Sequence, residues 1–208
     1  MICFPDTSLI FKLAGFDLLK EAFAPLGVPP DPVFILKETK QMCQGNKMRT
    51  KYGRTTLAII ETFIRQTSVI PITLNPVELE ILTDTDGIDG GELILFAATK
   101  DYNDFFIVTD DKNSLRALAE DVYCEAIFAR LAGKVVCLEQ LLLWIIERHS
   151  YAVVRPKLLR SPHEVRALEQ TLGLNRQSPQ NQVEAALLAA VDQLRLETNY
   201  ILVRPSFS

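Results

Sequence analysis

Short apolar runs alternate with segments of helical periodicity along the first 150 residues of the chain. Short, largely apolar runs predict strands at residues 2–4, 68–74, 105–109 and 135–138. Apolar residues three or four positions apart predict helices at residues 9–23, 32–43, 55–65, 76–82, 91–100, 114–122 and 141–149. Strands that are apolar on both faces and alternate with helices are typical of a covered parallel sheet. The pattern therefore predicts an α/β fold, a three-layer α/β/α domain with a central, mainly parallel sheet, over residues 1–150.

The pattern changes in the last part of the chain. Two segments of helical periodicity, 162–172 and 182–196, are separated by a polar stretch rich in Asn, Gln, Ser and Pro. We expect residues 151–208 to form a helical C-terminal extension of the domain.

Composition and charge exclude several classes of protein. The chain has 208 residues, of which 48% are hydrophobic and 23% charged, as in ordinary globular proteins. Its 22 basic and 26 acidic side chains exclude a generally polycationic nucleic-acid binder, although a local basic segment remains compatible with this balance. No apolar run reaches the roughly 18 residues of a membrane helix, and no positively charged n-region of a signal peptide precedes Asp6 and Asp17. These features predict a cytoplasmic protein without a membrane segment.

The four cysteines predict buried thiols rather than a disulfide framework or a zinc site. Cys3, Cys43, Cys124 and Cys137 are widely spaced and form no CxxC pair. A cytosolic chain with a full-sized core has little need of disulfides, and the two histidines have no ligand-like spacing to any cysteine. We therefore expect four free, buried cysteines.

Acidic residues follow two of the predicted strands directly. Asp6 comes after the first apolar run, and Asp110 and Asp111 come after the run at 105–109. Because ligands in open α/β sheets bind at the carboxyl ends of the strands, these carboxylates are expected to converge. The alternative interpretation is that Asp6 and the Asp110–Asp111 pair cap the helices that follow.

The segment between these positions is strongly acidic. Residues 76–111 contain ten acidic side chains and one lysine, and Glu92 lies one turn into an otherwise apolar helix. Converging carboxylates repel one another unless a cation lies between them, and hard oxygen ligands in a half-open site suit Mg²⁺ or Mn²⁺. The alternative for Glu92 is a favourable interaction with the helix dipole. A calcium-binding EF-hand loop beginning at Asp84 is excluded, because Asp89 and Leu95 stand where such a loop needs Gly and Glu.

Three motifs, in order, resemble those of PIN-domain proteins over about residues 1–145. They are the opening Phe-Pro-Asp-Thr-Ser-Leu-Ile, the helix Gly-Glu-Leu-Ile-Leu-Phe-Ala that begins at Gly91, and Val-Thr-Asp-Asp at 108–111. The resemblance implies Asp6, Glu92 and Asp111 as catalytic acids, with Glu38 as a further metal ligand and Asp110 as a substitute for Asp111. It also implies that the protein is a Mg²⁺- or Mn²⁺-dependent ribonuclease. Many PIN-domain proteins are VapC-type toxins that a small antitoxin protein neutralises, so the resemblance also implies a possible antitoxin partner.

One departure from the PIN pattern supports a second hypothesis. The family often has another acid two positions after the Thr-x-Asp aspartate, where this chain has Asn113. One carboxylate fewer weakens a metal site. The alternative is therefore a catalytically impaired PIN-like module that binds RNA or a protein.

Basic residues suggest where RNA would bind. Four of them lie within eight residues, in a segment predicted as a loop that starts at Gly45: Lys47, Arg49, Lys51 and Arg54. Such a segment is suited to RNA phosphates, or is simply a solvated loop. Arg116 follows Asp111 by about one helical turn, where it would contact a phosphate or pair with a neighbouring acid.

The remaining sequence features predict a dimer interface and exclude other enzyme classes. Trp144 and its apolar neighbours are predicted to form core or a dimer interface, and we expect a homodimer. No serine-hydrolase Gly-x-Ser-x-Gly, no dinucleotide-binding Gly-x-Gly-x-x-Gly and no phosphate-loop motif occurs.

Overall fold

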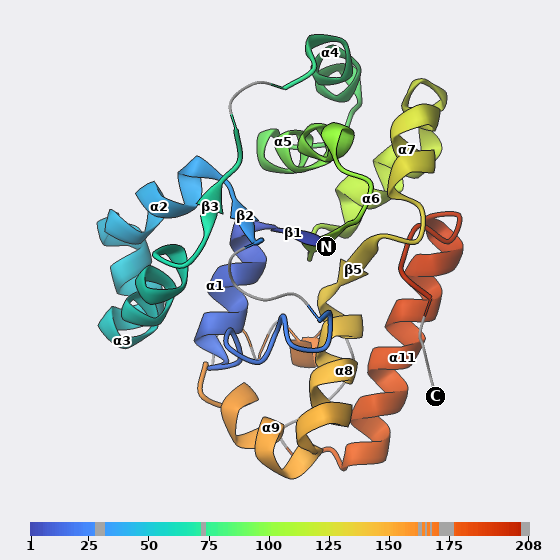
Figure 1. Cartoon of the computed structure of the whole chain (residues 1–208). Helices are drawn as coiled ribbons and strands as arrows, with labels where there is room; N and C mark the ends of the chain where they lie inside the picture. Colours follow the sequence, from blue (N-terminus) through green and yellow to red (C-terminus); the bar gives the residue numbers. More distant parts are fainter. Residues whose placement is uncertain are drawn as a thin grey trace.

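The computed structural model describes residues 1–27, 32–71, 74–161, 164, 166, 168–170 and 177–204 (Figure 1). The first part contains β1 (Ile2–Pro5), α1 (Thr7–Gly15), β2 (Phe34–Ile35), α2 (Lys37–Gln44), α3 (Asn46–Ile64) and β3 (Ser68–Val69). The middle part contains α4 (Pro76–Asp84), α5 (Gly90–Ala98), the 3-10 helix η1 (Thr99–Asp101), β4 (Phe105–Thr109), α6 (Lys112–Glu120) and the 3-10 helix η2 (Val122–Cys124). The last part contains α7 (Glu125–Leu131), β5 (Val135–Cys137), α8 (Leu138–His149), α9 (Tyr151–Leu158) and α11 (Gln180–Glu197).

The strands form a parallel arrangement in the order β3, β2, β1, β4, β5. β1, β4 and β5 make one parallel sheet, and β2 pairs with β3 in a second. An isolated parallel bridge between Cys3 and Val33 joins the two, and the Cys3 amide donates to the Pro32 carbonyl at 2.9 Å. Pro5 is in register with Val108, so the chain leaves β1 and β4 at the same edge of the sheet.

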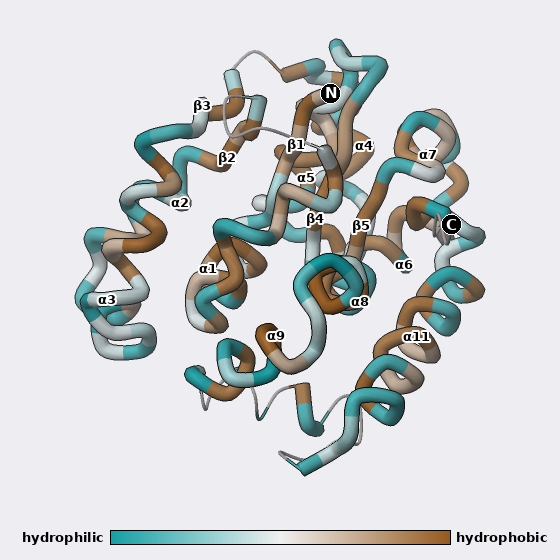
Figure 2. The backbone as a smooth tube through the Cα atoms, turned by 60° about the horizontal axis from the view of Figure 1, so that its bottom comes forward, coloured by the Kyte–Doolittle hydropathy of each residue, from teal (hydrophilic) through white to brown (hydrophobic). Residues whose placement is uncertain are grey.

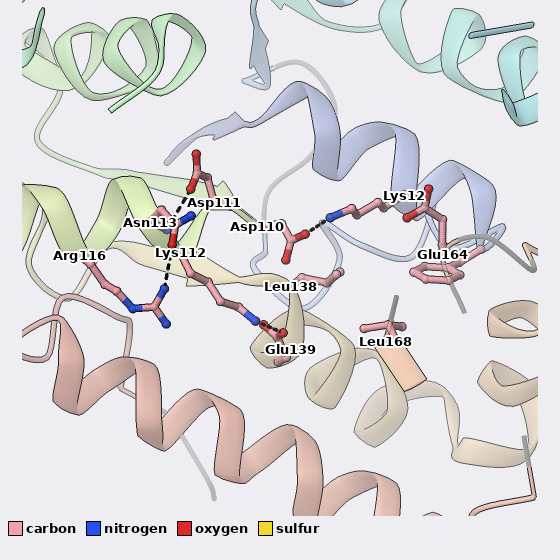
Figure 3. A pocket seen from close by; sticks show the side chains of 11 residues that line it. Lys12, Asp110, Asp111, Lys112, Asn113, Arg116, Leu138, Glu139, Glu164 and Leu168 are labelled. Atoms are coloured by element: carbon pink, nitrogen blue, oxygen red, sulfur yellow. Dashed lines mark hydrogen bonds and ion pairs between the residues drawn. The ribbon is translucent and has the colours of Figure 1, made fainter. Parts of the chain in front are cut away.

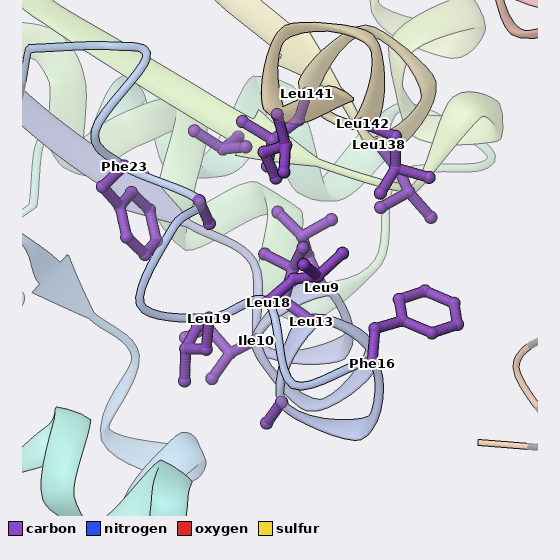
Figure 4. Packing of buried hydrophobic residues seen from close by; sticks show 14 of the residues in the cluster. Leu9, Ile10, Leu13, Phe16, Leu18, Leu19, Phe23, Leu138, Leu141 and Leu142 are labelled. Carbon is purple, nitrogen blue, oxygen red and sulfur yellow. The ribbon is translucent and has the colours of Figure 1, made fainter. Parts of the chain in front are cut away.

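Apolar residues on both faces of the sheet explain the layered architecture. Along the strands, alternate side chains enter two different hydrophobic clusters, because successive strand residues point to opposite faces. One cluster packs the sheet against α1, α3 and α8, and Figure 4 shows the leucines of α1 facing those of α8. The other cluster packs it against α5, α6 and α7. The predicted three-layer α/β/α fold is confirmed. The four cysteines are buried and free, also as predicted.

Helix α11 packs along α8, next to the β5 edge of the sheet (Figure 1). Figure 2 shows that apolar positions recur along this helix among polar ones, and Val183, Leu187, Val191 and Leu194 are its buried side chains. Leu202, after the helix, forms a parallel bridge to Val135 of β5. The described residues of the C-terminal extension therefore contribute to the same core as the sheet.

Several predicted boundaries are wrong. The first helix ends at Gly15 instead of continuing to residue 23, and Asp17 follows with a positive φ of 57° that interrupts helical geometry. The predicted helix at 32–43 is strand β2 followed by α2, because residues 34–35 pair with β3. The predicted basic loop after Gly45 is the first half of α3, which kinks at Gly53 (φ 78°).

Other predictions were incomplete or fall on residues outside the described part. The predicted strand at 68–74 is β3, which ends at Val69, and residues 72 and 73 are not described. The expected turn at 28–32 and much of the expected helix at 162–172 also lie outside the described residues. Helices α7 and α9 were not predicted. Within the described residues, no helix has the length and apolarity needed to cross a membrane.

Candidate metal centre

Three aspartates begin helices at the carboxyl edge of the sheet. Asp6 is the N-cap of α1, Asp89 of α5 and Asp111 of α6. Each accepts hydrogen bonds from the backbone amides two and three residues further on, at 2.8–3.2 Å. These bonds satisfy amides that lack a partner within the helix, which explains why aspartate suits these positions. The capping interpretation of Asp6 and Asp111 is therefore confirmed, and capping also holds the carboxylates in place.

Carboxylates from α5 and α6 meet in one cluster. One oxygen from each of Asp89, Glu92 and Asp111 lies within 4.8 Å of the other two, close enough for one metal ion. Asp89 is exposed, Asp111 is half-buried, and Glu92 has only 4% of its surface exposed. We name this group the acid cluster. Asp6 is not a member of it, although Asp6 is also buried, with 5% of its surface exposed.

The electrostatics of the acid cluster place a proton on Glu92. Burial raises the pKa of Glu92 from 4.5 to about 9, with further contributions from its hydrogen bond to Asp89 and from the charges of Asp6, Asp89 and Asp111. The hydrogen bond from Glu92 lowers the pKa of Asp89, which stays ionised. Burial also raises the pKa of Asp6. The raised pKa of Glu92 and the lowered pKa of Asp89 thus favour a protonated Glu92 beside an ionised Asp89 at neutral pH.

The donor set fits a hard divalent cation. All three groups offer carboxylate oxygens, which Mg²⁺, Mn²⁺ and Ca²⁺ prefer to nitrogen or sulfur ligands. Asp111 is held rigidly, because its Oδ2 also accepts from the Ser114 hydroxyl at 2.9 Å, and that hydroxyl lies 3.1 Å from the Gly87 carbonyl. A divalent ion would take the place of the Glu92 proton and relieve the repulsion among the carboxylates.

Three predicted ligands lie outside the acid cluster: Asp6, as described above, Glu38 and Asp110. Glu38 is exposed in the first turn of α2. Asp110 forms an ion pair with Lys12 of α1, which neutralises its charge without a metal. Figure 3 shows Asp110 and Asp111 directed to different partners, although they are neighbours in the chain.

A cavity of about 330 Å³ adjoins the acid cluster and shares Asp111 with it (Figure 3). Its polar lining combines cations with acids, including two lysine–carboxylate pairs: Lys12 with Asp110, and Lys112 with Glu139. Phe16, Leu138 and Leu168 give it an apolar wall. We name this space the Asp111 cavity.

The predicted RNA-binding residues divide into two groups. The four basic residues of α3 are exposed: Lys47, Arg49, Lys51 and Arg54. The Lys51 ammonium lies 3.5 Å from Glu164, which lines the Asp111 cavity, so this half of α3 reaches the cavity rim. Arg116 instead donates from Nε and Nη2 to Glu197 of α11 at 2.7 and 2.6 Å, as the alternative interpretation of this residue expected.

Three site residues were missed by sequence reasoning. Asp89 and Glu92 form an Asp-x-x-Glu sequence, which is a helix-start signal that would have placed Asp89 beside Glu92. Lys112 and Glu139 belong to different helices, and no local pattern links them.

Comparison of the chain with protein-family models, with curated proteins and with solved structures finds no match.

Proposed function

We propose that this protein is a metal-dependent endoribonuclease that hydrolyses RNA phosphodiester bonds with one Mg²⁺ or Mn²⁺ ion held by Asp89, Glu92 and Asp111. The observation that carries the proposal is the acid cluster, whose three oxygens lie within 4.8 Å of one another at the carboxyl edge of a parallel sheet. The resemblance of residues 1–145 to PIN-domain proteins supports the same activity. A single ion is favoured, because lysines already neutralise Asp110 and Glu139 beside the acid cluster.

Each acid has a distinct part in this proposal. A bound ion would activate a water molecule and neutralise charge on the phosphate that is attacked. The backbone amides of α6 and the Ser114 hydroxyl orient the Asp111 carboxylate before any ligand arrives. To serve as a ligand, Glu92 would have to release the proton that its raised pKa favours. Asp6 lies outside the ligand group and acts on it through its charge, which helps to raise the pKa of Glu92.

The exposed basic half of α3 would hold the RNA backbone. It approaches the Asp111 cavity through Lys51, and the two lysines inside the cavity are already paired with acids. For single-stranded RNA, each lost phosphate contact reduces the slope of log affinity against log salt by about 0.7. We expect Arg49→Ala and Arg54→Ala each to reduce the slope by about this amount, while Arg116→Ala leaves it unchanged.

Asparagine variants test the metal site without removing the helix caps. Asn caps helices about as well as Asp but carries no charge, so Asp89→Asn and Asp111→Asn should fold normally. With single-stranded RNA and Mn²⁺, we expect each variant to lose at least about 100-fold in cleavage rate, because even loss of a residue that only orients a metal ligand costs about 10- to 100-fold. Asp86→Asn, at an exposed acid of the same loop, is the matched control and should cleave like the wild type. Equal cleavage by all four proteins would refute the proposal.

A second candidate is a catalytically impaired module that binds RNA or a protein. It is favoured by the capping of Asp89 and Asp111, which gives these acids a structural role, and by Asn113, whose Oδ1 accepts from Arg116 at 3.1 Å. Calorimetric titration with Mn²⁺ separates the two candidates. Micromolar binding that Asp111→Asn abolishes supports the nuclease, and RNA binding without any Mn²⁺ binding supports the module.

A toxin role and a small antitoxin partner remain further proposals from the PIN resemblance, and a homodimer remains a proposal from the apolar residues around Trp144. Growth arrest on expression, relieved by co-expression of a small protein encoded beside it, is the result expected of a toxin. Light scattering would measure the mass of the purified protein, and a value near 23.4 kDa would refute the dimer.

A further inference from the structure

The side chain of Arg116 is held by the end of α11. Its Nε and Nη2 lie 2.7 and 2.6 Å from Oε2 of Glu197, the last residue of that helix, and its Nη1 donates to Asn113 Oδ1 at 3.1 Å. The Glu197 carboxylate is itself held, because Gln193 donates to its Oε1 at 2.7 Å. A guanidinium binds a phosphate best through two parallel N–H bonds. The edge formed by Nε and Nη2 is thus already taken by a carboxylate.

Arg116 also belongs to the wall of the Asp111 cavity. It follows Asp111 by five residues on α6, and both residues line the cavity (Figure 3). The two lysines of the cavity pair with Asp110 and Glu139, whose side chains are only 13% and 2% exposed, whereas Glu197 is 30% exposed. An exposed ion pair changes an equilibrium only about 1.5- to 5-fold. Of these three pairs, the one between Arg116 and Glu197 is therefore the most readily exchanged for a solvated phosphate.

The place of Glu197 in its own helix does not account for it. The carboxyl end of a helix carries partial negative charge, so a glutamate there is unfavourable unless a cation lies beside it. Arg116, from α6, is such a cation. Hydrogen bonds from Gln193 and Arg116 lower the pKa of Glu197, which stays ionised at neutral pH. The contact with α6 rather than the stability of α11 therefore explains an acid at this position.

We propose that Glu197 restrains RNA binding by holding Arg116, and that release of Arg116 adds one phosphate contact beside the metal centre. The inference rests on the proposed nuclease function and assigns an inhibitory contact to its site. Glu197 is a positioning residue, since it acts through Arg116 and does not contact the RNA. While the pair is closed, the basic half of α3 holds the RNA backbone without help from α6.

The salt dependence of RNA binding tests the proposal. Binding of a fluorescent single-stranded RNA is measured by anisotropy in EDTA, which prevents metal-dependent cleavage, over a series of KCl concentrations. We expect Glu197→Ala to bind about 1.5- to 5-fold more tightly at low salt, as loss of an exposed ion pair implies. The slope of log affinity against log salt should become steeper by about 0.7, the value for one added phosphate contact. Asp192→Ala, at an exposed acid of the same helix, removes an equal charge and should leave the slope unchanged.

A second substitution assigns the effect to Arg116. In the variant that combines Glu197→Ala with Arg116→Ala, the added slope should disappear. A readout without RNA is the NMR signal of the Arg116 Nε–H group, identified by its absence from Arg116→Ala. On addition of inorganic pyrophosphate, this signal should shift in Glu197→Ala and stay in place in the wild type and in Asp192→Ala. The exchanged side chains are exposed, so all these variants should melt close to the wild type.

The outcomes separate this inference from the proposed function. If RNA binds and Glu197→Ala has the same slope as the wild type, the pair only attaches α11 to α6, and the inference is refuted while the nuclease stands. A steeper slope that persists when Arg116 is also replaced refutes it too. If RNA is neither bound nor cleaved, the nuclease proposal fails and pyrophosphate decides the inference. A shift in Glu197→Ala alone supports the restraint on Arg116, and equal behaviour of Glu197→Ala and wild type refutes it.

Discussion

Replacing Glu92 by glutamine should stabilise the protein without divalent ions and weaken its stabilisation by them. In the folded protein the pKa of Glu92 is raised from 4.5 to about 9, chiefly because the carboxyl is buried. The unfolded chain therefore releases this proton at a lower pH than the folded chain does. Stability from this group is fully present below pH 4.5 and is lost progressively as pH rises toward about 9. Glutamine cannot ionise, so Glu92→Gln removes this loss.

The size of the effect follows from the pKa difference. pH 8 lies 3.5 units above the ordinary Glu pKa of 4.5. At this pH the wild type has therefore lost at most about 5 kcal/mol of folding free energy through ionisation of Glu92 in the unfolded chain. Solvent reaches the cluster through exposed Asp89 and screens part of the interaction, so we expect about 2 kcal/mol. For a chain of this size the melting temperature should rise by about 4–8 °C at pH 8. At pH 4.5 wild type and variant should melt at nearly the same temperature.

Thermal melting at both pH values, with EDTA and with Mn²⁺, is the assay. Mn²⁺ at 100 times its dissociation constant should stabilise the wild type by about 2.7 kcal/mol and Glu92→Gln by much less, which reverses their order. Glu80→Gln, at an exposed acid of α4, is the control and should follow the wild type throughout. A lower melting temperature for Glu92→Gln at pH 8 in EDTA would refute the electrostatic argument. Undiminished stabilisation of the variant by Mn²⁺ would refute the assignment of Glu92 as a ligand.

Three further predictions concern the fold, and denaturant unfolding checks each of them. Leu187→Ala should lower the free energy of unfolding by about 3 kcal/mol, in a single cooperative transition, because Leu187 is buried in the core that α11 shares with the sheet. Leu188 is 38% exposed, so the control Leu188→Ala should change the free energy of unfolding by less than about 0.5 kcal/mol. Arg130→Met should cost about 2 kcal/mol, since its two bonds to buried Glu78 at 2.9 and 2.7 Å would be lost; an unchanged midpoint would contradict this. Gly53→Ala should cost about 2 kcal/mol, because the kink of α3 has φ 78° and ψ 166°, and a neutral result would show that the kink can relax.

Much of the fold was predictable because its signals are local. The runs at 105–108 and 135–138 are apolar at every position, and they form most of β4 and all of β5, the two strands that are buried on both faces. The helix predicted at 32–43 was wrong for a reason that is not local. Residues 34–35 become a strand because β3, more than thirty residues later, supplies their hydrogen-bond partners.

In the candidate site, too, some features follow from local sequence signals and others depend on residues far apart in the chain. The sequence by itself determined that Asp6 and Asp111 follow strands and that Glu92 begins a helix, because strand ends and helix starts have local patterns. Only the tertiary structure decided that Asp89 joins Glu92 and Asp111 while Asp110 pairs with Lys12, since the register of the sheet and the position of each helix set those distances. The meeting of Lys112 and Glu139 depends in the same way on how α6 and α8 leave the sheet. Charge acts over a few ångströms in space, and separation along the chain does not determine which carboxylates come that close.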